Sequence, residues 1–190
     1  MRRLVYYITI STDGMYADPD GGLADFEPAE DEHRYANRLL DAAGDIVMGR
    51  VMYDVMGYWD DLDLDDSNVP DVEREFATFW RQTPKHVVSR GRPALRPNAS
   101  QIEGDVVEAV RAMKDADGPG IMLGCGADLF AQLTEAGLID EYRFLVAPMA
   151  LGRGKALFAS LEAPLKLRLT NSTTTSAGGV LLEYVPTGDG

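Results

Sequence analysis

The chain has 190 residues, of which 45% are hydrophobic and 26% charged, and 31 acidic against 18 basic residues give a formal net charge of −13. This composition is typical of a soluble globular protein and excludes collagen-like and disordered chains. The acidic balance argues against a nucleic-acid or anionic-membrane partner. The single cysteine, Cys125, excludes an internal disulfide framework, and the absence of a signal-peptide pattern predicts a cytoplasmic protein.

The first half of the chain alternates strand-like and helix-like patterns. Residues 4–11 are β-branched and aromatic and predict a strand that ends at an Asp-Gly turn. Apolar residues at helical spacing predict a helix over 31–43, closed by Gly44. The same periodicities predict short strands at 45–48 and 86–89 and helical segments at 51–56 and 72–80.

The second half continues this alternation and then changes. Helices are expected at 106–113 and 129–133, and strands at 121–123 and 142–147. Leucines alternate with polar residues over 165–170, and a Gly-Gly turn precedes a last strand over 180–185. This period of two predicts a strand with one solvated face. We therefore expect one three-layer α/β domain over residues 1–190, with a mostly parallel sheet and a C-terminal antiparallel hairpin.

Three turns that suit a phosphate follow predicted strands. They are Met48-Gly49-Arg50, Ser89-Arg90 and the run Gly124, Cys125, Gly126, Ala127, Asp128 and Leu129. Ligands of open α/β sheets bind beyond the carboxyl ends of the strands. Glycine backbone, guanidinium groups and helix N-termini all accommodate phosphate oxygens. Taken singly, each turn is also compatible with a tight connection that exposes an arginine.

Ordered motifs run through most of the chain. They comprise Ser11-Thr12-Asp13-Gly14, Met48 to Tyr53, His86 to Arg90, Gly124 to Leu129, Gly137-Leu138-Ile139-Asp140-Glu141, and Pro148, Gly152, Gly154 and Leu157-Phe158. Together they resemble the dihydrofolate reductase fold and, more closely, the reductase domain of riboflavin biosynthesis, the RibD C-terminal family, in a stand-alone bacterial form. Cys125 departs from this pattern, because the family usually has a Gly-Gly pair there.

The resemblance implies an NADPH-dependent oxidoreductase that transfers a hydride to a small pyrimidine-like heterocycle, as 5-amino-6-(5-phosphoribosylamino)uracil reductase does. It implies that the pyrophosphate lies on Gly49 and Arg50 and the adenosine 2′-phosphate on Ser89 and Arg90. The turn from Gly124 to Leu129 would cover the pyrophosphate, with Gly124, Cys125 and Gly126 closest. The nicotinamide would lie near Thr9, Tyr16 and Ala17.

The substrate side offers fewer signals. Asp13 is the candidate catalytic acid at the substrate edge, although it also fits a simple turn before Gly14. His33 aligns with the carboxylate that holds the pterin ring in dihydrofolate reductase, and Glu32 lies beside it. Tyr53 and Trp59 are candidates for an aromatic substrate pocket, or for a small hydrophobic cluster of no catalytic importance.

Two other functions remain open at this stage: a dihydrofolate reductase, and a non-catalytic nucleotide-binding protein on the same fold. No metal is expected, because the two histidines lie far apart in the sequence and lack ligand spacing. The C-terminal hairpin offers a sheet edge, and relatives commonly pair, so we expect a homodimer besides the small-molecule substrate.

Overall fold

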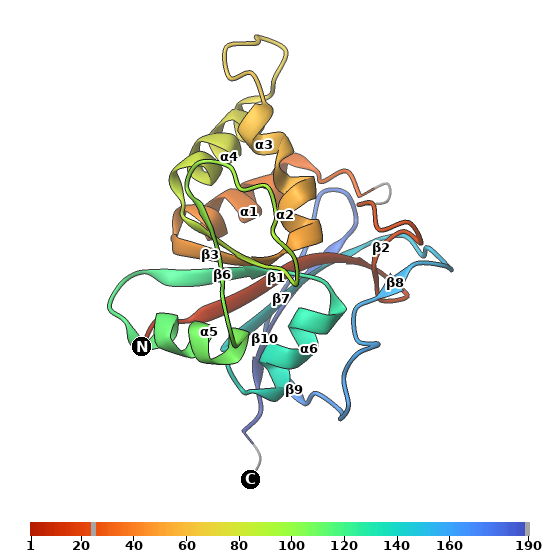
Figure 1. The fold of residues 1–190 in the computed structure, drawn as a ribbon. Helices are drawn as coiled ribbons and strands as arrows, with labels where there is room; N and C mark the ends of the chain where they lie inside the picture. The colour runs from red at the N-terminus through yellow and green to blue at the C-terminus, as the bar shows by residue number, and fades with distance from the viewer. Residues whose placement is uncertain (24–25, 189–190) are drawn as a thin grey trace.

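A computed structural model describes residues 1–23 and 26–188. Eight strands form one sheet in the order β5-β4-β3-β6-β1-β7-β10-β9 (Figure 1). Their bounds are β1 Leu4–Ser11, β3 Ala43–Gly49, β4 Lys85–Val88, β5 Ala99–Gln101, β6 Gly120–Gly124, β7 Glu141–Ala147, β9 Leu167–Thr174 and β10 Val180–Pro186. Two short strands, β2 (Met15–Ala17) and β8 (Lys155–Ala156), form a second sheet.

The strands from β5 to β7 run parallel to one another, whereas β10 pairs antiparallel with both β7 and β9. The predicted mostly parallel sheet with a C-terminal hairpin is therefore confirmed. All parallel strands have their carboxyl ends at one edge of the sheet, which is where the three phosphate-compatible turns were predicted to meet.

Helices cover both faces of the sheet, which confirms the three-layer architecture (Figure 1). One face carries α1 (Glu30–Asp41), α2 (Arg50–Met56), α3 (Tyr58–Asp61) and α4 (Asp71–Gln82), and the other carries α5 (Val106–Asp115) and α6 (Ala127–Glu135). Within residues 1–23 and 26–188, no helix has the length and apolar character needed to cross a bilayer.

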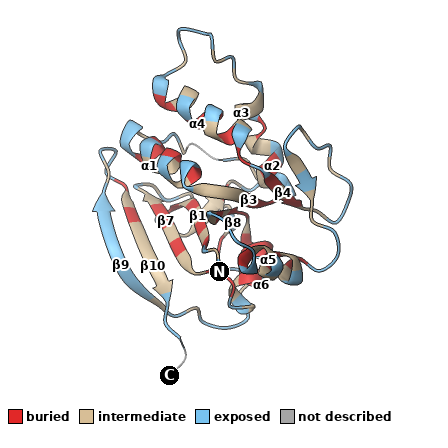
Figure 2. Ribbon diagram, turned by 90° about the vertical axis from the view of Figure 1, so that its left-hand side faces the viewer, coloured by how far each residue is buried: buried red, intermediate tan, exposed pale blue. Residues whose placement is uncertain are grey.

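Two hydrophobic cores lie on opposite faces of the sheet, as the buried segments in Figure 2 indicate. Alternation along β1 places Tyr6 and Ile8 in the larger core, together with Phe130 of α6. The smaller core joins Ile46 of β3 to Trp80 of α4. Because successive side chains of a strand point to opposite faces, Tyr7 and its neighbours two residues away face α1 instead.

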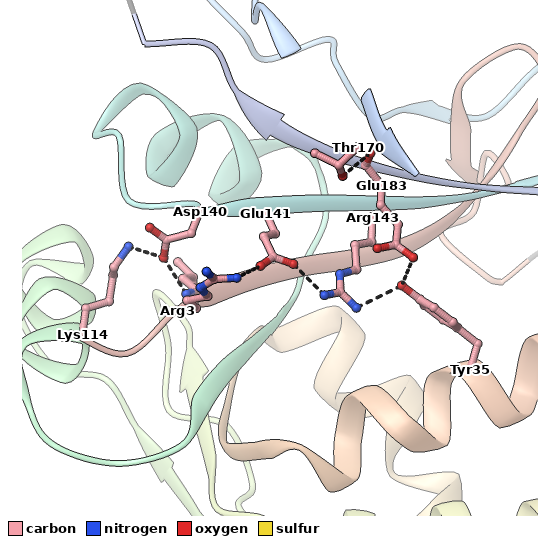
Figure 3. Close-up of polar contacts among 9 residues, drawn as sticks. Arg3, Tyr35, Lys114, Asp140, Glu141, Arg143, Thr170 and Glu183 are labelled. Atoms are coloured by element: carbon pink, nitrogen blue, oxygen red, sulfur yellow. Dashed lines mark hydrogen bonds and ion pairs between the residues drawn. The ribbon is translucent and has the colours of Figure 1, made fainter. Parts of the chain in front are cut away.

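A chain of polar contacts fixes α1 to the sheet (Figure 3). The guanidinium of Arg143 on β7 donates to Glu141 over 2.6 Å and to the Tyr35 hydroxyl over 3.0 Å. The Tyr35 hydroxyl donates to Glu183 of β10 over 3.2 Å. The contacts link helix, central strand and hairpin, so they hold in place the helix that covers one face of the sheet.

The structure corrects the sequence analysis at the C-terminal edge. The leucine alternation at 165–170 predicted one buried face, but Leu169 is 48% exposed and β9 has no buried residue. Strand β9 is the outermost strand of the sheet, and its register with β10 shifts between Glu183 and Tyr184. The elements β2, β5, β8 and α3 were not predicted, because segments of two to four residues carry too little periodicity.

Candidate functional site

The three phosphate-compatible turns lie side by side at the carboxyl edge of the sheet. In the strand pairing, Met48 of β3 lies opposite Gly124 of β6, and Gly49 lies opposite Val88 of β4. The turns after Gly49, Val88 and Gly124 therefore leave the sheet next to one another. This convergence is the arrangement that one extended, phosphate-bearing ligand requires.

The turn after β6 presents backbone rather than side chains. Gly126 is the N-cap of α6, and no side chain caps the helix, so its first N–H groups remain as donors. Cys125 is fully buried in the larger core, and burial raises the pKa of its thiol far above the ordinary range. Ala127 and Leu129 are also buried. Asp128 is exposed and accepts a hydrogen bond from Ser160.

The arginines of the other two turns differ in whether they form ion pairs within the protein. Arg50 pairs with Asp54 one turn further along α2, at 3.2 Å. Arg90 is exposed and, within the described part of the chain, makes no hydrogen bond or ion pair. The Ser89 hydroxyl accepts a bond from the Gly91 N–H over 3.2 Å. The Ser89-Arg90 turn thus carries a cation available to a ligand.

A cavity of about 440 Å³ lies between the sheet and the helices α1, α2 and α4. This volume falls within the usual range of small-molecule sites. Its floor comes from the sheet residues Tyr7, Thr9, Met48, Met122, Gly124, Leu145 and Ala147. Its roof comes from His33, Ala36, Leu40, Met52, Met56, Trp59, Phe76 and Trp80. The turn glycine Gly124 also forms part of the floor, so cavity and turns are continuous.

An aromatic cluster forms the roof around His33. The imidazole packs edge-on against Trp59 and against Phe76, each with ring centroids 5.5 Å apart, and its Nδ1 lies 3.1 Å from Asn37 Oδ1. The predicted pocket residues His33 and Trp59 therefore lie together. Tyr53 does not line the cavity: its ring is buried and its hydroxyl accepts a bond from the Arg96 N–H.

The polar side chains of the cavity gather on one side. Glu32 lines the wall, where its carboxylate accepts bonds from the Ala29 N–H over 2.9 Å and the Thr175 hydroxyl over 2.6 Å. Tyr7 and Thr9 lie beside it on the floor. Burial raises the pKa of the Tyr7 phenol far above its ordinary value, and the Glu32 charge raises it further. Tyr7 therefore remains a neutral hydroxyl.

The predicted catalytic residue Asp13 does not line the cavity. Its carboxylate accepts bonds from the Ser11 hydroxyl and from the N–H groups of Leu151 and Gly152, at 3.1 and 2.7 Å for the latter two. These bonds, that of Ser11 first, lower the pKa of Asp13. The ionised carboxylate holds the 151–152 loop against the end of β1. This geometry supports the structural alternative for Asp13 and makes it a poor proton donor.

Two of the three residues expected near the nicotinamide line the cavity. Thr9 and Tyr16 line it, while Ala17 is buried in β2. The Tyr16 ring packs against Gly126, where an added Cβ would lie 2.6 Å from the phenolic oxygen. A Cβ at Gly154 would clash with the Ala17 carbonyl oxygen. Glycine at 154 is therefore required for β8 to pack beside β2.

Comparison with known proteins decides the family. The model of the RibD C-terminal domain matches residues 2–181. The chain belongs to the RibD C-terminal domain family. The uncharacterised protein YyaP of Bacillus subtilis (strain 168) is 28% identical over 194 residues, which cover 96% of this chain and 94% of YyaP.

Solved structures show that the fold is that of the dihydrofolate reductases. A candidate riboflavin biosynthesis protein from Shewanella sp. PV-4 superposes with a TM-score of 0.71 at 19% identity, covering 98% of this chain and 99% of its own. Dihydrofolate reductase from Enterococcus faecalis, complexed with NADP(H), gives a TM-score of 0.65 at 12% identity, covering 98% and 97%. At these identities the likeness concerns the fold alone.

Sequence reasoning missed most of the cavity wall of this RibD C-terminal domain. Among the lining residues that it did not single out as site residues are Tyr7, Met52, Met56, Phe76, Trp80, Met122, Leu145 and Met149. The period-two pattern of β1 identifies Tyr7 and Thr9 as sharing one face. No comparable signal marks the methionines and aromatic residues, because helical spacing predicts a buried face but not a hollow beneath it.

Proposed function

We propose that this chain is an NADPH-dependent reductase of a small heterocyclic, pyrimidine-like substrate. One observation carries the proposal: Gly124 lies both in the floor of the cavity and at the start of the turn that leads to α6. A coenzyme bound along the three turns would therefore have its reactive end directed into the cavity. The RibD C-terminal family membership and the dihydrofolate reductase fold support this assignment.

The residues of the sheet edge fit the coenzyme. An added Cβ at Gly49 or Gly124 would make only ordinary van der Waals contacts with the protein, at 3.8 and 3.9 Å, so the packing of the chain does not itself require glycine at either position. The uncapped N-terminus of α6 supplies donors for a pyrophosphate. The free guanidinium of Arg90, beside Ser89, suits the 2′-phosphate. The coenzyme would supply the hydride.

The protein's own part in the reaction is positioning and exclusion of water. Thr9, on the floor, and Tyr16 both line the cavity and would orient the nicotinamide there. The aromatic roof around His33 would hold the acceptor ring above the floor. Alignment of two reactants in a closed site removes much of the entropic barrier of a bimolecular reaction.

Titration of the purified protein with NADPH and with NADH tests the coenzyme assignment. We expect NADPH to bind more tightly. Arg90→Ala should weaken NADPH binding by about 10- to 100-fold, since a hydrogen bond between charged groups contributes about 1.5–3 kcal/mol, and should leave NADH binding unchanged. Arg92→Ala, a nearby arginine exchange, is the control. Equal losses for both coenzymes would show that Arg90 does not hold the 2′-phosphate.

Glu32 favours dihydrofolate reductase as a second candidate function. It is an acidic residue of α1 in the cavity wall, as recognition of a pterin would require. Both of its oxygens already accept hydrogen bonds from Ala29 and Thr175. Micromolar or tighter binding of methotrexate would support this function. If NADPH binds and no heterocycle is reduced, the non-catalytic nucleotide-binding alternative would hold instead.

A further inference from the structure

The wall of the cavity is rich in methionine. Of the eight methionines in the chain, five line this one cavity: Met48, Met52, Met56, Met122 and Met149. They belong to β3, α2, β6 and the segment after β7, so residues that lie far apart in the sequence come together in the folded chain. Thioethers are flexible and polarizable and make favourable contacts with aromatic rings.

Aromatic side chains complete the wall. Trp59 and Phe76 pack with ring centroids 4.7 Å apart, and Trp80 is almost completely buried behind them. Both tryptophans of the chain, Trp59 and Trp80, line the cavity. A planar ring is the shape that such a wall of flat and adaptable groups would enclose most fully.

The charged side chains of the cavity wall are all acidic. Among the described residues that line the cavity there is no lysine or arginine, whereas Glu27 and the buried Glu32 are acidic. The arginines of the sheet edge, Arg50 and Arg90, lie outside this lining. A phosphate or carboxylate inside the cavity would lose its hydration without gaining a counter-charge, which is strongly unfavourable.

We propose that this cavity takes an uncharged, planar and largely apolar heteroaromatic ring that bears no phosphate or carboxylate. The inference rests on the proposed reductase function for calling this ring the substrate. A substrate whose phosphate or carboxylate would have to lie inside this cavity is therefore excluded. The methionines widen the range of rings accepted, since their side chains adapt to different outlines.

A rigid pair of probes tests the proposal. Quinoxaline is neutral, and quinoxaline-2-carboxylate carries an anion fixed to the same ring, so the charge cannot reach outside the cavity. Binding is followed by quenching of tryptophan fluorescence, which arises only from residues of the cavity wall, and is checked by calorimetry. We expect quinoxaline to bind at least tenfold more tightly than its carboxylate.

Two variants at one position make the result specific. Met56 is partly exposed and lies in the wall, so Met56→Lys adds the missing cation there. We expect Met56→Lys to reduce the preference for the neutral probe to about twofold or less, while the matched Met56→Leu control retains it. Circular dichroism and thermal unfolding confirm that each variant is folded.

The outcomes separate this inference from the reductase assignment. Equal or tighter binding of the carboxylate by the unaltered protein, or no binding of quinoxaline at millimolar concentration, would overturn the inference, whatever the NADPH titration gives. Tight quinoxaline binding together with no NADPH binding would instead refute the reductase, and with it the description of the ring as a substrate.

Discussion

The buried Lys114 of α5 and its partner Asp140 make the clearest test of the packing between α5 and the sheet. The Lys114 ammonium donates to the Leu138 carbonyl and to Asp140 Oδ2, each over 2.5 Å, and Asp140 also accepts from the Leu4 N–H over 2.7 Å (Figure 3). The two side chains differ in exposure: that of Lys114 is 3% exposed and that of Asp140 is 40% exposed.

This difference predicts unequal costs for removing each charge. Asp140→Asn leaves a buried ammonium without a counter-charge, which should cost about 3 kcal/mol of unfolding free energy, near the lower end for a broken buried pair. Lys114→Met leaves a carboxylate that water can hydrate, and the lost hydrogen bonds should cost about 1 kcal/mol. The double variant should be more stable than Asp140→Asn alone, because it no longer buries a charge.

Urea unfolding measures these differences. With a denaturant dependence of about 2 kcal/mol per molar, the midpoint should fall by about 1.5 M for Asp140→Asn and by about 0.5 M for Lys114→Met. If Lys114→Met is destabilised as much as Asp140→Asn, or if the two losses simply add in the double variant, the argument from unequal exposure is wrong.

Three further predictions concern the loops and the sheet edge. Gly154→Ala forces a Cβ against the Ala17 carbonyl, so it should lower the free energy of unfolding by about 1–3 kcal/mol and weaken coenzyme binding. The control is Gly152→Ala, whose Cβ lies in open space at a φ of 66°. This control should lower the free energy of unfolding by about 1 kcal/mol and leave the Kd of the coenzyme unchanged. Hydrogen bonds from a serine hydroxyl and two N–H groups lower the pKa of Asp13 in the folded protein. The ionised Asp13 therefore stabilises the fold above about pH 4, and this contribution is lost as the pH falls through the lower, folded-state pKa. In Asp13→Asn, the melting temperature should depend less on pH at the acid end of a series of melting curves between pH 2.5 and 7. We also propose that two chains form a homodimer through the exposed strand β9. Light scattering should then give a mass of twice 20.8 kDa for the unaltered protein and the mass of a monomer for Leu169→Glu. A monomeric unaltered protein would refute the dimer.

The sheet edge could be predicted from the sequence because it follows from strand direction alone. Once the strands before Gly49, Ser89 and Gly124 are recognised as parallel, their turns must leave the same edge of the sheet, and the pairing of Met48 with Gly124 shows that two of them are neighbours. The spacing of apolar residues in the helix before Pro84 likewise identified its buried face, which includes Phe76 and Trp80.

The cavity could not be predicted, because it depends on how helices pack and not on which residues they contain. Tyr53 and Trp59 are six residues apart and equally aromatic, yet they lie in two different helices, α2 and α3. Both side chains belong to or pack against the smaller core, but only Trp59 lines the cavity. The structural use of Asp13 depends on the 151–152 loop, more than a hundred residues away in the chain.

Floor and roof of the cavity come from different stretches of the polypeptide. Residues 32–80 supply the roof and the β3 part of the floor, whereas the rest of the floor comes from β1, β6 and β7 and includes Gly124, at the start of the turn after β6. Exchanges at roof positions such as Ala36, Met56 and Phe76 therefore change the outline presented to an acceptor without touching the turn after β6. A library restricted to these positions would vary the ring that the cavity can enclose and leave the turn after β6 unaltered.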